Sequence, residues 1–244
     1  MGLFDDAEKV KSGHFYRKFS QAYGSKDLDT YFSGSEVAQT GICSGSGLHW
    51  IRHYLTNDTL YSNEQMMSDK SDILTTQKAV RVRDQSLRNL LIECGMKPRA
   101  NHLNNYKFEK EDARDVAHLL CASEGVNTIS YCHPQFGNHV VTCYVSKEDK
   151  RMYFSDVHKG DVSLPYPASI DWLTRYFKIF NDQCGEISVT HFESNWNEAA
   201  YQKTRLSLAE SAKEYGKPKV DEHLEVPILF DKSNQPKNHS EFTA

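Results

Sequence analysis

The feature that most constrains the fold is a change in hydrophobic periodicity near residue 125. Before this point apolar residues recur at the spacing of helices, with Gly95 and Gly125 as stop signals. After it, short alternating segments rich in β-branched and aromatic residues are separated by turn sequences. Helices followed by an antiparallel sheet predict an α+β fold. Helices are expected at 44–55, 71–94, 111–124, 169–180 and 196–215, and strands at 126–133, 139–145, 151–156 and 186–193.

The chain is expected to form one domain. Its 244 residues are enough to bury a substantial core, and no internal repeat divides them. Within a single domain over 1–244, we expect an irregular N-terminal segment at 1–35, a core at 36–215 and a polar C-terminal tail at 216–244. The tail holds one apolar patch, "VPILF", for which docking onto the core is favoured over a free interaction motif.

Composition and charge disfavour several classes of protein. The net charge is -4 and Lys and Arg are scattered, whereas a nucleic-acid binder normally presents a basic face. No apolar run approaches the roughly 18 residues that span a bilayer, and the N-terminus lacks the pattern of a classical signal peptide. The cysteines are widely spaced without a CxxC pair, so we expect free thiols and neither a metal nor a cofactor. They are Cys43, Cys94, Cys121, Cys132, Cys143 and Cys184.

Cys43 stands among small residues in "TGICSGSGLHWI", at the start of a predicted helix. The partial positive charge and unpaired amides of a helix N-terminus favour the thiolate, which is the nucleophilic form of cysteine. The same amides, that of Ser44 included, can receive the oxyanion of a tetrahedral intermediate, and Gln39 can add a side-chain donor. The small neighbours are expected to leave room for a substrate backbone. The alternative is a small buried residue where a loop enters a helix.

The segment "GNHVVTCYVSKEDKRMYFSD" predicts a hairpin that pairs a histidine with a carboxylate. If the turn spans 146–149 and Val145 lies opposite Lys150, then His139 lies opposite Asp156 at the edge of an apolar face. Directly opposed Cβ atoms are about 4.5–5.5 Å apart, which suits a general base and its orienting acid. The alternative is an ordinary cross-strand charge pair at the rim of a sheet.

A cysteine at a helix start, a histidine at a strand start and an aspartate at the end of the next strand follow the order found in papain-like thiol hydrolases. The chain most resembles the YopT/AvrPphB family of bacterial effector cysteine proteases. The matching motifs are "GICSGSGLHWI", "GNHVV" and "MYFSD", with 96 residues from Cys43 to His139 and 17 more to Asp156. The resemblance covers residues 39–160.

The resemblance implies a papain-like cysteine protease fold, in which the helix-borne Cys43 packs against an antiparallel β-sheet. By the same resemblance Cys43 is the nucleophile, His139 the general base and acid, and Asp156 the residue that orients His139. Members of the family are typically injected into host cells, where they cut host proteins, in several cases small GTPases. We therefore expect a protein substrate, and a virulence factor delivered to the host cytosol by a specialised secretion system.

Other histidines and carboxylates compete for these roles. His133 and His158 flank the site and replace His139 if the register is wrong, and Asp161 is the corresponding rival of Asp156. His49 and His53 stand at i and i+4 on the Cys43 helix, which is the spacing of a metal pair. Because they point away from the apolar stripe of that helix, a solvated face is the favoured interpretation.

Two further classes of function stay open. The same cysteine–histidine machinery serves amidases, acyltransferases and deamidases. A non-catalytic binding protein on the same scaffold would leave Cys43 without a chemical role. Labelling by a thiol reagent directed at the active site separates the enzymes from the binding protein.

Overall fold

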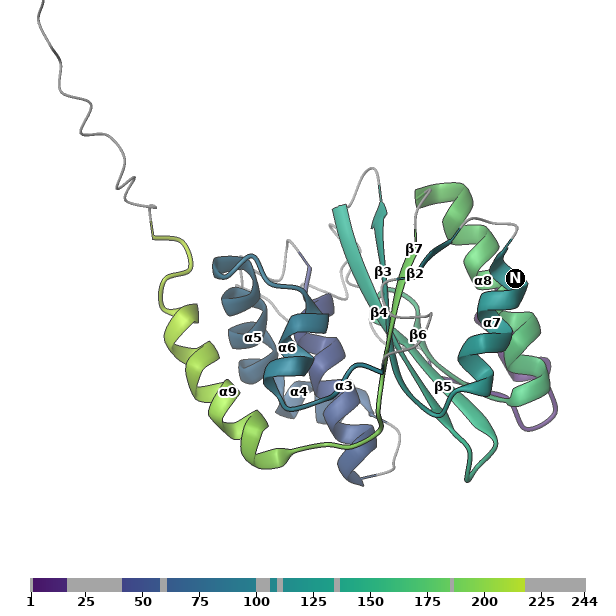
Figure 1. Ribbon diagram of the computed structural model, residues 1–244, viewed down its shortest axis with the longest axis horizontal. Coiled ribbons are helices and arrows are strands. Elements are labelled where there is room, and N and C mark those ends of the chain that lie inside the picture. Colours follow the sequence, from purple (N-terminus) through teal and green to yellow (C-terminus); the bar gives the residue numbers. More distant parts are fainter. Residues whose placement is uncertain are drawn as a thin grey trace, which may run out of the picture.

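A seven-stranded antiparallel sheet separates two groups of helices in the computed structural model of the chain (Figure 1). The strand order is β1-β6-β5-β4-β3-β7-β2, so the shortest strands stand at the edges. Figure 1 shows α3, α5, α6 and α9 on one side of the sheet, and α7 and α8 on the other. The structure describes residues 2–16, 41–57, 61–99, 106–108, 112–133, 137–184 and 187–217.

The elements have the following bounds. The strands are β1 (His14–Tyr16), β2 (Tyr106–Phe108), β3 (Gly125–His133), β4 (Gly137–Ser146), β5 (Arg151–Asp156), β6 (Gly160–Pro165) and β7 (Ile187–Phe192). The helices are the 3-10 helix η1 (Asp5–Lys9), α3 (Cys43–Asn57), α4 (Asn63–Ser68), α5 (Lys70–Val82), α6 (Leu87–Glu93), α7 (Ala113–Ala122), α8 (Tyr166–Cys184) and α9 (Glu198–Ala212). None of the described helices is both long and apolar enough to span a bilayer.

Most of the expected elements are confirmed, and two expectations are wrong. The single helix expected at 71–94 is two helices, α5 and α6, because Asp84 adopts a left-handed φ of 49°. Ser86 then starts α6 as its N-cap, with a side chain that accepts a hydrogen bond from the Asn89 amide. The sheet also contains β1, β2 and β6, which the expected strands did not include. Of these, β1 lies in the segment 1–35 that was expected to be irregular, and β6 has apolar residues, Val162 and Leu164, that alternate along the chain.

The register of the central hairpin differs by two residues from the predicted one. Val145 lies opposite Met152, not Lys150, and the last pair before the turn is Ser146 with Arg151. The Ser146 hydroxyl accepts the Asp149 amide at 3.2 Å, and Lys150 closes the turn with a φ of 54°. The strand therefore continues through Ser146, which was expected to begin the turn. A shift of two residues keeps each side chain on its predicted face.

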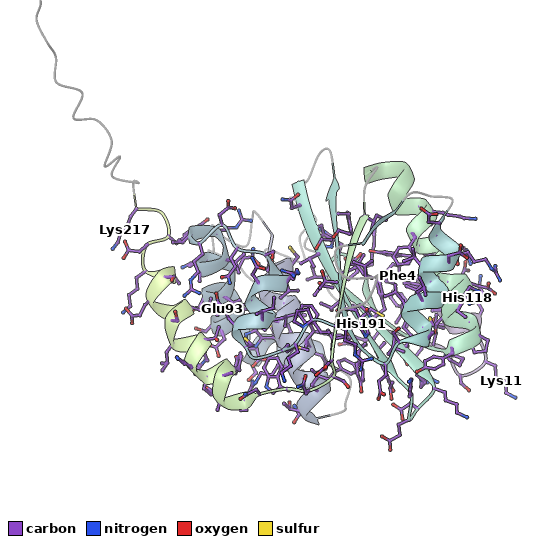
Figure 2. The ribbon with its side chains drawn as sticks, in the orientation of Figure 1. Phe4, Lys11, Glu93, His118, His191 and Lys217 are labelled. Atoms are coloured by element: carbon purple, nitrogen blue, oxygen red, sulfur yellow. The ribbon has the colours of Figure 1, made fainter. Side chains whose placement is uncertain are left out.

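Two apolar cores cover the two faces of the sheet. Val141, Cys143 and Val145 of β4 lie in the core beneath α7 and α8, whereas Val140 belongs to the core beneath α3, α5, α6 and α9. Phe4, labelled in Figure 2, joins the first core and meets Trp172 of α8 edge-on, with ring centroids 5.2 Å apart. Both faces of the sheet are thus buried, and chemistry that needs solvent is confined to its ends.

A buried histidine in the sheet predicts loss of stability in acid. His191 of β7 is fully buried, and its Nδ1 lies 2.7 Å from Oδ1 of Asn127. Burial, assisted by the positive charge of Arg99, lowers the pKa of His191 to about 4. At a pH between the ordinary histidine pKa of about 6.5 and the lowered pKa, His191 binds a proton in the unfolded chain but not in the folded chain. The free energy of unfolding therefore falls as the pH falls.

His191→Gln, which keeps a hydrogen-bonding side chain but does not titrate, is expected to remove this contribution. From pH 7 to about pH 5, the wild type should lose about 2 kcal/mol more of its unfolding free energy than the variant. Urea unfolding at the two pH values measures the difference. Equal losses in both proteins would show that another group causes the acid sensitivity.

Candidate active site

Cys43 is the first residue of α3, directly after a backbone turn at Gly41. Gly41 has a φ of 100°, a conformation that L side chains rarely adopt. The first helical bond near the site runs from the Ser46 amide to the Ile42 carbonyl at 2.9 Å. The helix itself therefore leaves the amides of Cys43, Ser44 and Gly45 without intrahelical acceptors. The Gly45 amide donates instead to the buried Oε1 of Gln77 at 3.1 Å. A role of the Cys43 and Ser44 amides in an oxyanion hole stays a prediction.

The small residues that follow Cys43 serve the packing of α3, which corrects the expectation that they leave room for substrate. A Cβ on Gly45 would lie 2.4 Å from the Ile73 carbonyl oxygen of α5. A Cβ on Gly47 would lie 2.9 Å from Leu87 Cδ2 of α6 and 3.2 Å from Thr142 Cγ2 of β4. Glycine at these two positions lets two helices and the sheet approach α3 closely, which fixes the position of Cys43.

His139 and Asp156 meet at the end of the sheet that lies beside Cys43. The β4–β5 pairing ends at Thr142 with Ser155, and both residues lie beyond this last pair. His139 Nε2 donates to Asp156 Oδ1 at 3.1 Å, and both side chains are almost completely buried. His139 also hydrogen-bonds Cys43. Because Nε2 faces Asp156, the nitrogen left for the sulfur is Nδ1.

The side chains of Cys43, His139 and Asp156 together favour an ion pair between Cys43 and His139. Burial alone would raise the pKa of Cys43, but its hydrogen bond with His139 and the positive charge of that ring lower it. Hydrogen bonds with the Val140 backbone and the Ser44 side chain act in the same direction. Burial opposes the cation on His139, yet Asp156 and Cys43 raise its pKa to about 9. Both shifts favour the pairing of a thiolate with an imidazolium.

Asp156 stays ionised although it is fully buried. Burial favours its neutral form, whereas the hydrogen bond from His139 and the charge of that ring lower its pKa. The backbone amide of His158 donates to the same oxygen, Oδ1, at 2.8 Å. In addition, the Lys159 amide donates to the Asp156 backbone carbonyl at 3.0 Å. The turn after β5 thus holds the carboxylate in the position that orients His139.

The alternative candidates for the general base and the orienting acid make other contacts. Asp161 lies in β6, and its Oδ2 accepts the Trp50 Nε1 proton at 3.1 Å. It ties α3 to the sheet. His158 borders His139 with ring centroids 4.3 Å apart, whereas His139 is the ring bonded to Cys43 and Asp156. The side chain of His133 lies outside the described residues, as does Gln39, whose role in the oxyanion hole stays a prediction.

The histidine pair on α3 corrects another expectation. His49 is buried, not solvated, because α9 covers it: its ring meets the Tyr201 ring edge-on at 6.4 Å. Its Nδ1 lies 3.6 Å from Asp69 Oδ2. His53 is partly exposed, and both rings line a polar pocket of about 300 Å³ that also includes Glu198. Within the described residues, no group of three or more His, Cys, Asp or Glu side chains could hold a metal ion.

The environments of the described cysteines predict selective labelling of Cys43. Cys94 and Cys121 are buried, and burial raises the pKa of each thiol to about 12. Burial raises the pKa of Cys143 as well, whereas that of Cys43 is lowered and its side chain is partly exposed.

We expect iodoacetamide near pH 6 to alkylate Cys43 well before the other cysteines, because the thiolate is the reactive form. Peptide mapping by mass spectrometry measures the order of labelling, and Cys43→Ala is the control that should remove the fast phase. Uniform slow labelling of all cysteines would contradict a stabilised thiolate.

Comparisons with known proteins show a distant structural likeness. No family model matches the chain, and no curated protein matches it. One similar solved structure is the crystal structure of the Pseudomonas avirulence protein AvrPphB, with a TM-score of 0.46 and 12% sequence identity. The match covers 68% of this chain and 98% of that chain.

Proposed function

We propose that this chain is a papain-like thiol protease that cleaves a peptide bond of a protein substrate through an acyl-enzyme on Cys43. One observation carries the proposal. A single buried imidazole, His139, bonds the sulfur at a helix N-terminus and, through Nε2 at 3.1 Å, a buried carboxylate. A nucleophile, a base and a residue that orients the base are the groups that acyl transfer requires.

In the first half of the proposed reaction, the Cys43 thiolate attacks the carbonyl carbon of the scissile bond. The carbonyl oxygen becomes an oxyanion near the amides of Cys43 and Ser44, where the N-terminus of α3 favours negative charge. The His139 imidazolium then donates its Nδ1 proton to the amide nitrogen as the carbon–nitrogen bond breaks. The amine leaves, and the acyl group stays on the sulfur.

In the second half, neutral His139 takes a proton from a water molecule as the water oxygen attacks the thioester carbonyl. The tetrahedral intermediate collapses, the carbon–sulfur bond breaks, and the carboxylic acid product leaves a thiolate beside an imidazolium. Asp156 keeps Nε2 protonated throughout, so that Nδ1 is the nitrogen that exchanges protons. The resting ion pair is thus restored.

The biological part of the proposal rests on the sequence motifs around Cys43, His139 and Asp156. A bacterial effector that is delivered into the host cytosol and cleaves a host protein agrees with those motifs. A small GTPase is the first substrate to test. The activity itself needs neither a metal nor a cofactor, because the thiolate and the imidazolium supply the nucleophile and the proton.

The proposal is tested by adding wild type and Cys43→Ala protein to a eukaryotic cell lysate and labelling new peptide N-termini for mass spectrometry. We expect a small set of new N-termini with the wild type and none with the variant. Side-chain modification without new N-termini would replace the protease by a deamidase or an acyltransferase. Identical profiles for the two proteins, with Cys43 inert to iodoacetamide, would contradict enzyme function altogether.

A further inference from the structure

We infer that His158 is a positioning residue for His139: its neutral ring supports the Cys43–His139 ion pair, and a proton on His158 weakens that pair. The inference rests on the proposed function, since it concerns the same cysteine. It makes the nucleophile sensitive to mildly acidic pH through a histidine that takes no part in the chemical steps.

His158 lies against the ring of His139. The two centroids are 4.3 Å apart and the planes are inclined by 44°. His158 lies in the turn after β5, and the contact agrees with the hairpin register, in which residue 158 would be level with residue 139 if the pairing continued past Thr142 and Ser155. Tyr131 of β3 meets His139 edge-on, with centroids 5.1 Å apart. The imidazole of His139 is thus bordered by a phenol ring and by a second imidazole.

The backbone and the side chain of His158 make separate contacts: the amide binds Asp156, and the ring contacts His139. Its amide holds Asp156 Oδ1 at 2.8 Å, a bond that any residue other than proline makes at this position. Substitution of the side chain therefore leaves the carboxylate in place. The ring, in contrast, is half-buried and contacts the ring of His139, and a partly exposed imidazole is a group that mildly acidic pH can protonate.

A charge on His158 acts more strongly on His139 than on Cys43. Asp156 Oδ1 binds both the His139 Nε2 proton and the His158 amide, whereas Cys43 faces the other ring nitrogen of His139. The backbone of His158 is consequently held on the side of the imidazolium that is away from the thiolate, and its ring contacts the ring of His139. Like charges in contact disfavour ionisation, so a cationic His158 shifts the pair toward neutral thiol and neutral imidazole.

Among the described residues, the titratable groups near His158 come from β4, β5, the start of α3 and the turn after β5. His139 belongs to β4, Asp156 ends β5, and Cys43 begins α3 beyond His139. The exposed Lys159 follows in the turn. Asp156 attracts a proton to His158, and His139 repels it. The repulsion by His139 is present only while His139 carries the charge of the ion pair, which couples the charge of His158 to the state of the nucleophile.

The test measures the rate of Cys43 alkylation by iodoacetamide between about pH 5 and pH 8 in the full chain, a readout that needs no substrate. The variants are His158→Gln, which removes the charge, and His158→Phe, which removes the charge but keeps a ring over His139. His118→Gln, an exposed histidine of α7 on the far side of the sheet (Figure 2), is the matched control.

We expect the rate in the wild type to fall between pH 7.5 and about pH 5.5 by about tenfold more than in either His158 variant, as for a shift of about one pKa unit. His118→Gln should follow the wild type. Superimposable profiles for the wild type and both His158 variants would overturn the inference and leave the proposed function intact. An equal change in His118→Gln would also overturn it, because the effect would not be local.

The two proposals fail in different ways. If Cys43 in the wild type reacts no faster than the buried cysteines at any pH, the proposed function fails and the inference fails with it. If Cys43 reacts selectively but its pH profile is independent of residue 158, only the inference fails. Thermal melting of each variant identifies a folding defect, and His158→Phe still tests the charge if His158→Gln does not fold.

Discussion

Asp156→Asn is expected to lower kcat by about 100- to 10,000-fold, and Cys43→Ala and His139→Ala should abolish turnover. Asparagine keeps an oxygen for the 3.1 Å bond from His139 Nε2 but removes the negative charge that stabilises the imidazolium. We expect the decrease in kcat to be smaller than the upper end of this range, because the thiolate–imidazolium pair is already partly formed in the resting enzyme. Turnover of a cleavable peptide identified in the lysate experiment, measured together with melting temperature, separates loss of catalysis from loss of fold.

Asp161→Asn is the matched control for this prediction. Asp161 is as buried as Asp156, but its carboxylate accepts the Trp50 Nε1 proton, a bond that the amide oxygen of asparagine can also accept. We expect this variant to keep turnover close to that of the wild type. If Asp161→Asn is the inactive variant, or if His139→Ala retains activity, the assignment of base and orienting acid is wrong.

Gly45→Ala is expected to lower the unfolding free energy by about 3 kcal/mol, at the upper end of the cost of overpacking a core. The added Cβ would lie 2.4 Å from the carbonyl oxygen of Ile73, a backbone atom within α5 that cannot turn aside as a flexible side chain would. For a chain of this size the melting temperature should fall by about 10 °C, which differential scanning calorimetry measures.

The control for this second prediction is Gly216→Ala. Gly216 has a φ of 79°, and no atom lies within 4 Å of the position that a Cβ would take there, so only the backbone conformation opposes the substitution. Its expected cost is about 1 kcal/mol. A melting temperature for Gly45→Ala equal to that of the control would mean that α3 and α5 are not in close contact. The packing explanation of the small residues after Cys43 would then be wrong.

Local patterns in the sequence determined where most elements lie and which residues face each core. The bounds of β5, the start of α3 at Cys43 and the common face of Val141 and Cys143 follow from short-range periodicity and turn chemistry. The helix expected at 71–94 is divided because a local turn, closed by the Ser86 cap, overrides the helical spacing on either side. Side-chain alternation has a period of two and therefore cannot distinguish registers that differ by two residues.

Tertiary contacts decided the residue pairs on which function depends. The Ser146 hydroxyl accepts a hydrogen bond within the hairpin turn that sets the register, and the turn after β5 places His158 beside His139. Packing of α9 over α3 buries His49, which the pattern of its own helix placed in solvent. Cys43 reaches His139 because Gly47 lets α3 approach β4. These contacts join residues far apart in the chain, and no local pattern specifies them because each depends on how whole helices and strands pack together.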